Sequence, residues 1–130
     1  MNINLKLTKE NLICLTNTVY LLFGFNMDDN INYTLFYNLT NITNRLARIK
    51  FSTNFSTRKN YTFTLSPNDA TALLELINMS LDILENMPYE QNLLITICAE
   101  IDKQTLNNMH NIESFKNKIL IEKTGNNLIN

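Results

Sequence analysis

The chain has 130 residues, of which 45% are hydrophobic, and a formal net charge of −1. These values fit one globular domain and exclude a disordered chain. The small net charge also excludes a general electrostatic attraction to nucleic acid or to an anionic membrane surface. Asparagine is abundant, with 23 copies. Because Asn is a poor helix former, helices in this chain must depend on packing within the domain or against a partner.

The most hydrophobic early stretch, residues 12–25, resembles neither a membrane anchor nor a leader. It is too short to span a bilayer, and polar residues at 16–18 interrupt it. Glu10 and Asn11 precede it and no small-residue cleavage site follows, which argues against a signal peptide. We therefore expect a cytoplasmic protein that makes no membrane contact.

The first predicted elements are a strand and a helix. Residues 3–7 alternate between apolar and polar side chains, as in a half-buried strand. Thr8 suits the N-cap of a helix, and Gly24 marks its expected end. Apolar residues at helical spacing define the buried face of this helix, namely Leu12, Leu15, Val19 and Leu22.

A second helix is predicted to begin at Asp28 and Asp29, because negative charge is favourable at a helix N-terminus. Its apolar residues recur in steps of four and three, which indicates one buried face. They are Leu35, Leu39, Ile42, Leu46 and Ile49.

A β-hairpin is predicted next. Ile49, Phe51 and Phe55 alternate with polar residues, which is typical of a strand. The five residues STRKN at 56–60 then lead to a second alternating run at 61–65.

The segment S-P-N-D at 66–69 is the clearest local signal in the chain and predicts a third helix. Ser66 suits the N-cap, Pro67 the first helical position, and Asp69 completes a capping box. Pro88 is expected to break this helix. The buried face is predicted to contain Ala70, Leu73, Ile77, Leu81 and Leu84.

A fourth helix follows, with Leu94, Ile97, Cys98 and Ile101 on its buried face. Residues 112–122 fit either a helix or a strand, because Ile112, Phe115 and Ile119 have helical spacing while ILIE at 119–122 could pair in a sheet. The last seven residues, 124–130, are expected to form a flexible, frayed tail.

A shift of 58 positions aligns the two halves of the chain. The shift aligns Leu5 with Phe63 and the cap Thr8 with the cap Ser66, and it also aligns the helical stripes. We therefore expect one domain over 1–123 with an internal duplication, 1–58 and 59–116. The predicted fold is α+β and mainly helical, with two tandem strand–helix–helix units, about four helices in all, packed with a small antiparallel sheet.

Charge is distributed unevenly along the sequence. Residues 30–68 contain no acid and have a net charge of +5, whereas residues 69–102 contain no base and have a net charge of −7. The candidate basic face consists of Arg45, Arg48, Lys50, Arg58 and Lys59. The candidate acidic face consists of Glu75, Asp82, Glu85 and Glu90.

Three interpretations of these charges remain open. The two segments could face each other within the domain as solvated, weakly paired surfaces. They could instead meet between copies, head to tail, which gives rings or filaments. Alternatively, the basic segment, which is interleaved with aromatic residues, could bind single-stranded nucleic acid.

No residues suggest catalysis or a bound cofactor. The two glycines, Gly24 and Gly125, cannot form a glycine-rich phosphate loop. Cys14 and Cys98 lie among apolar residues and are interpreted as reduced core thiols. His110 lies in a polar run and is interpreted as an exposed loop residue. We therefore expect no enzyme, no catalytic residues, no metal, no cofactor and no small-molecule substrate.

These observations favour a small protein-binding or self-assembling module with a structural or accessory role. Its expected partner is a second copy of the chain or another protein. The alternative is a nucleic-acid-associated protein that uses the basic hairpin at 45–63.

Overall fold

The computed structural model describes residues 1–26, 32–52 and 55–129, with side chains described as far as residue 122. The first half contains strand β1 (Ile3–Thr8) and helices α1 (Lys9–Phe25) and α2 (Tyr33–Lys50). The second half contains strand β2 (Asn60–Leu65), helix α3 (Pro67–Ser80), a short 3-10 helix η1 (Leu81–Leu84) and helix α4 (Pro88–Ile129). The order strand–helix–helix occurs twice, and the predicted mainly helical α+β fold is confirmed.

The two strands form an antiparallel sheet in which Leu5 lies opposite Phe63. Alternate side chains of both strands point to one face, which is apolar and buried. A two-stranded sheet is marginally stable at best in water, so its apolar face has to be covered by helices. The buried residues of this face are Ile3, Leu5, Leu7, Tyr61, Phe63 and Leu65.

The predicted hairpin is wrong, because β2 pairs with β1 and not with residues 49–55. Ile49 lies in the last turn of α2, and Phe51 is the C-cap of this helix with 80% of its surface exposed. Phe55 packs on Tyr61, with 5.5 Å between the ring centroids. Residues 53 and 54 of the predicted strand lie outside the described part of the chain. Among the described residues of this run, Ile49 and Phe51 therefore belong to the end of α2, and Phe55 packs beside β2 without being part of a strand.

Side-chain caps begin three of the helices. Thr8 caps α1 and Ser66 caps α3, each by accepting a hydrogen bond from the backbone of the first turn, as predicted. Helix α2 is capped in the same way by Asn32. Asp28 and Asp29, where the sequence predicts the start of this helix, lie outside the described residues.

Two predicted helix ends are corrected by the structure. Gly24 lies inside α1, which ends one residue later, at Phe25, with Asn26 as its C-cap. Helix α3 ends at Ser80, and Pro88 begins α4 instead of breaking α3. Proline is tolerated at the first helical position because its missing N–H would have no partner there.

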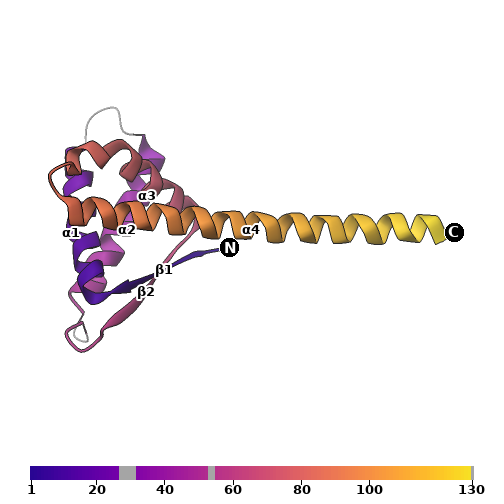
Figure 1. Ribbon diagram of the computed structural model, residues 1–130, viewed down its shortest axis with the longest axis horizontal. Coiled ribbons are helices and arrows are strands. Elements are labelled where there is room, and N and C mark those ends of the chain that lie inside the picture. The colour runs from indigo at the N-terminus through magenta and orange to yellow at the C-terminus, as the bar shows by residue number, and fades with distance from the viewer. Residues whose placement is uncertain (27–31, 53–54, 130) are drawn as a thin grey trace.

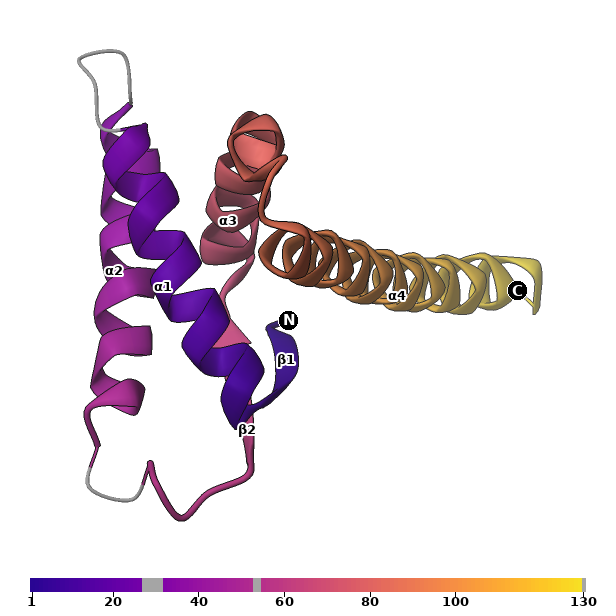
Figure 2. The same ribbon diagram turned by 60° about the vertical axis from the view of Figure 1, so that its left-hand side comes forward.

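A single hydrophobic core joins the sheet to the helices. Figures 1 and 2 show α1, α2 and α3 grouped together, with α4 passing this group before it projects away from the domain. Helix α4 contacts α1, α3 and β1 on its way. The predicted core positions of the four helices are buried, except that Ile49, Leu81 and Cys98 are half-buried.

The sheet register agrees with the 58-residue correspondence between the two halves. Leu5 and Phe63, which the sequence shift makes equivalent, are also directly opposite each other in the sheet. A two-fold rotation through this pair therefore exchanges the two strands in register. The equivalent helix residues Leu15 and Leu73 are both fully buried. The duplication itself stays a prediction, which the register supports.

Helix α4 is far longer than the sequence indicates. Residues 112–122, which the sequence leaves undecided, are helical, and the helix continues through 124–129, the residues assigned to a tail. The domain boundary at residue 123 stays a prediction.

Leu73 lies on α3 and is fully buried, so we expect Leu73→Ala to lower the free energy of unfolding by about 2–5 kcal/mol through lost burial and a new cavity. Chemical denaturation measures the loss. The control is Glu75→Ala, which changes an exposed position on the same helix and is expected to shift stability by less than about 0.5 kcal/mol. Equal effects of the two substitutions would show that this core is wrongly assigned.

Candidate functional site

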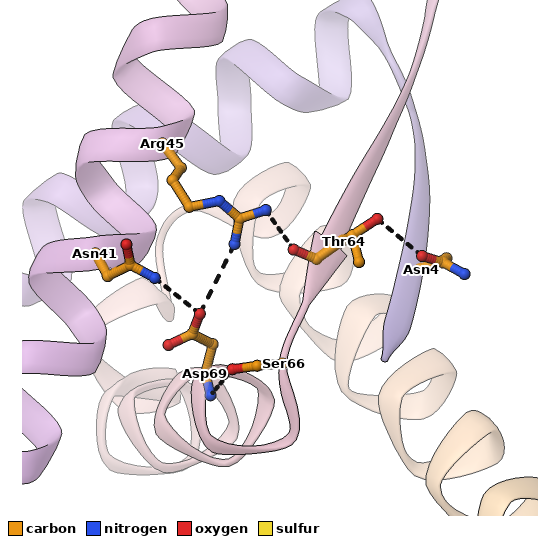
Figure 3. A network of polar contacts seen from close by, with 6 residues as sticks. All are labelled: Asn4, Asn41, Arg45, Thr64, Ser66 and Asp69. Carbon is orange, nitrogen blue, oxygen red and sulfur yellow. Dashed lines mark hydrogen bonds and ion pairs between the residues drawn. The ribbon is translucent and has the colours of Figure 1, made fainter. Parts of the chain in front are cut away.

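Arg45, predicted to belong to a basic face, is a tertiary link between three elements (Figure 3). Its guanidinium lies 3.7 Å from the carboxylate of Asp69 on α3 and donates a hydrogen bond to the backbone carbonyl of Thr64 on β2. The same group lies 4.5 Å from the ring centroid of Phe63. Arg45 therefore holds α2 against the second strand–helix unit and is not available as a free surface charge.

Asp69 completes this network from α3. Its side chain is buried, with the residue 5% exposed, and its carboxylate accepts a hydrogen bond of 2.9 Å from the Asn41 amide. Its backbone N–H donates to the Ser66 hydroxyl, as the predicted capping box requires. The carboxylate, however, turns towards α2 in the network of Figure 3, so only one half of the capping box is formed.

The other predicted basic residues gather at one end of the molecule. Arg48 and Lys50 lie in the last turn of α2, and Arg58 and Lys59 directly precede β2. Within the described residues, the ion pair of Arg45 is the single salt bridge, so these four charges have no acidic partner there. We call Arg48, Lys50, Arg58 and Lys59 the basic end.

Aromatic rings at the basic end are covered by cations of the chain itself. The ammonium of Lys9 lies 5.2 Å from the ring centroid of Phe55, and the guanidinium of Arg58 lies 5.7 Å from that of Tyr61. Lys50 lies 5.8 Å from the ring of Phe51, which is otherwise exposed. The basic and aromatic side chains thus come together as the sequence indicates, although not on a hairpin.

The predicted acidic residues lie at the other end of the helices. Glu75 belongs to the second half of α3, Asp82 to η1, and Glu90 to the first turn of α4, with Glu85 between these last two elements. Figures 1 and 2 show η1 at the opposite end of the domain from the loop that precedes β2. Among the described residues, the basic and acidic faces are therefore not brought together, because the acid that Arg45 contacts, Asp69, is not part of the acidic face.

Gln104 anchors α4 to the outer edge of β1. Its side-chain oxygen accepts a hydrogen bond of 2.8 Å from the Asn4 N–H, and its side-chain nitrogen donates one of 2.7 Å to the Asn4 carbonyl. The same nitrogen also donates to Glu100. The Gln104 amide therefore takes the place that a neighbouring strand would occupy and blocks this part of the exposed edge.

Beyond this anchor, α4 leaves the domain, as Figure 1 shows, and carries an uncovered apolar stripe. Ile101 is buried in the domain, whereas Ile112 is half-buried and Met109, Phe115 and Ile119 are exposed. Because the positions from Met109 to Ile119 recur every three or four residues, they lie on one side of the helix, and this side continues the core-facing side that carries Ile101. We call residues 105–122 the projecting segment.

A groove lies where the projecting segment leaves the domain. It has a volume of about 210 Å³ and is lined by α4, the start of α3 and the N-terminus of the chain. Its walls are mostly apolar and include Ile3, Ala70, Leu74, Met109 and Ile112. No sequence motif predicts this site, and its one signal is the helical spacing of Ile112, Phe115 and Ile119.

Cys14, Cys98 and His110, which are all described, are not arranged as a disulfide or a metal site. Cys14 and Cys98 are free thiols that pack against the core, and burial raises the pKa of both, which lowers their thiolate content at neutral pH. His110 is exposed, as predicted, but it lies on helix α4 and not in the loop that the sequence indicates. Throughout the described ranges, no three His, Cys, Asp or Glu side chains are placed to hold a metal ion.

Comparison with known proteins gives no relative on which to base a function: no family model, curated protein or solved structure matches this chain. In the part of the chain that the structure describes, no helix has the length and hydrophobicity needed to cross a membrane.

We expect Arg45→Ala to lower the free energy of unfolding by about 1–3 kcal/mol, because it leaves the buried Asp69 carboxylate and the Thr64 carbonyl with fewer partners. The matched control is Arg48→Ala, one turn along the same helix but exposed, with an expected change of less than about 0.5 kcal/mol. Urea denaturation of both variants measures the difference. If Arg45→Ala is as stable as the control, the network of Figure 3 has no structural role.

Proposed function

We propose that this chain is a self-assembling protein module whose main contact is the projecting segment of α4. The observation that carries the proposal is the exposure of Met109, Phe115 and Ile119 along one side of a helix that has left its own domain. Exposed apolar surface arranged as a continuous stripe marks a protein interface more often than isolated apolar residues do.

The composition of the projecting segment strengthens this proposal. Residues 105–122 include Asn107, Asn108, Asn111 and Asn117, and Asn is a poor helix former. In proteins, most of the stability of a helix comes from packing of its apolar face and not from intrinsic propensity. Packing against a partner supplies the stabilisation that the sequence itself lacks.

The charged ends provide a second, weaker contact. Because the basic end and the acidic residues lie at opposite ends of the domain, one copy can present positive charge to the negative charge of the next. A head-to-tail contact of this kind repeats without closing unless its rotation forms a ring. It is also screened by salt, whereas burial of the apolar stripe is not.

Nucleic-acid binding is the second candidate, and it is favoured by the four cations of the basic end, which have no acidic partner in the described part of the chain. It is less well supported, because Phe55 and Tyr61 are covered by cations of the chain, which leaves Phe51 as the most exposed of these three rings. Affinity for a single-stranded oligonucleotide that falls steeply with added salt would favour this candidate over assembly.

We expect the full chain to sediment as a species larger than the monomer at micromolar concentration and high salt. Phe115→Glu is expected to return it to the monomer, because it places a charge in the apolar stripe. The control Ser114→Glu adds the same charge at the neighbouring position, which points away from the stripe, and should assemble like the unchanged protein. A full chain that remains monomeric at every concentration would contradict the proposed function.

A further inference from the structure

The groove beside α4 has mostly apolar walls, which suit an apolar occupant. It is bounded by Ile3, Ala70 and Leu74 of the domain and by Ile101, Met109 and Ile112 of α4. Ile3, Ala70 and Ile101 are almost completely buried, whereas Met109 is about half exposed, so the groove opens outwards at the projecting segment.

The chain cannot fill this groove from its own α4. Helix α4 is continuous from Pro88 to Ile129, so each residue after Ile112 lies farther from the domain. At 1.5 Å of rise per residue, Ile119 lies about 10 Å beyond Ile112 along the helix axis. Phe115 and Ile119 therefore point along the same side as the groove but past its end, and only another molecule can cover them.

We propose that two copies of this chain pair through antiparallel α4 helices, with the two-fold axis beside Ile112, and that each copy fills the groove of the other. This inference rests on the proposed function as a self-assembling module and specifies its interface. In an antiparallel pair centred on Ile112, Phe115 of one copy lies beside Met109 of the other. Ile119 lies beside Thr105 in the same way, and both Met109 and Thr105 line the groove.

The two-fold arrangement covers the groove and the stripe of Met109, Ile112, Phe115 and Ile119 with one contact, whereas Leu106 and Ile121, on other sides of the helix, stay exposed. The stripe of each copy packs into the groove of the other, so both grooves are filled. A two-fold contact of this kind uses the same surface on both copies and adds no third copy. The two domains then lie at opposite ends of the helix pair, because the anchor at Gln104 lies eight residues before the two-fold axis in each copy.

The charges of the projecting segment suit a copy of itself better than a strongly charged partner. Residues 105–122 contain two glutamates, Glu113 and Glu122, and two lysines, Lys116 and Lys118, and their net charge is zero. Two such segments can therefore approach each other without net repulsion, whereas a strongly acidic or basic partner gains no long-range attraction.

Disulfide trapping tests this arrangement in the full-length chain with Cys14→Ala and Cys98→Ala as background. Backbones that face each other across two packed helices come within about 5 Å, which a disulfide can bridge. Mild oxidation of Ile112→Cys is therefore expected to give a covalent dimer as the main product on a non-reducing gel. The control Ser114→Cys, on the opposite side of the helix, is expected to stay monomeric on the gel.

A second pair of variants reports the direction of the helices. Thr105→Cys and Ile119→Cys are each expected to form little homodimer, whereas an equimolar mixture forms the 105–119 heterodimer after subunit exchange. Homodimers of both single variants, or no heterodimer from the mixture, would overturn the antiparallel pairing. If those results come from a chain that still sediments as a dimer sensitive to Phe115→Glu, self-assembly stands and only the antiparallel arrangement fails. A monomeric chain overturns both proposals.

Discussion

The pairing of β1 with β2 is the interaction on which the rest of the structure depends. It joins two strand–helix–helix units that are 58 residues apart in sequence, with Leu5 opposite Phe63 at its centre. Neither strand could form a sheet alone, and the pair has an apolar face that water would destabilise. The helices of both halves must therefore cover one shared face, which explains why the chain has one core and not two.

The outer edges of this sheet determine where α2 and α4 lie. Arg45 reaches from α2 to the backbone of Thr64, and Gln104 reaches from α4 to the backbone of Asn4. Each long side chain supplies hydrogen bonds at a strand position that has no neighbouring strand. Beyond the anchor at Gln104, the helix lines the groove as far as Ile112 and then extends away from the domain. The same helix is thus a part of the core over its first turns and an uncovered surface over the projecting segment.

Local sequence signals predict local structure well in this chain. The alternation at residues 3–7, the caps Thr8 and Ser66, and the helical stripes lead to the observed elements, because each signal depends on neighbouring residues. The hairpin prediction failed for the opposite reason, since strand pairing is non-local and β2 finds its partner near the N-terminus. Residues 49–55 are much nearer to β2 in sequence than β1 is, so sequence proximity favours the wrong pairing partner.

The candidate site was only partly predictable, for related reasons. The two charge clusters are visible in the sequence, but only the fold shows that Arg45 is tied to Asp69 while Arg48 remains exposed. The apolar spacing of Ile112, Phe115 and Ile119 is equally visible. It could not be interpreted as an interface without knowing that the helix projects away from the core here, because a stripe of the same spacing is usually covered by the protein's own core.

Amide hydrogen exchange at two protein concentrations tests most directly whether a second copy stabilises the projecting segment. The account predicts that amides of residues 105–122 exchange slowly at high concentration and become fast on dilution, while amides of α1 and α3 stay protected throughout. The dilution series reports on the segment in the unmodified, full-length chain and needs no variant. Protection of residues 105–122 that is equally strong at all concentrations, or absent at all of them, would contradict the account.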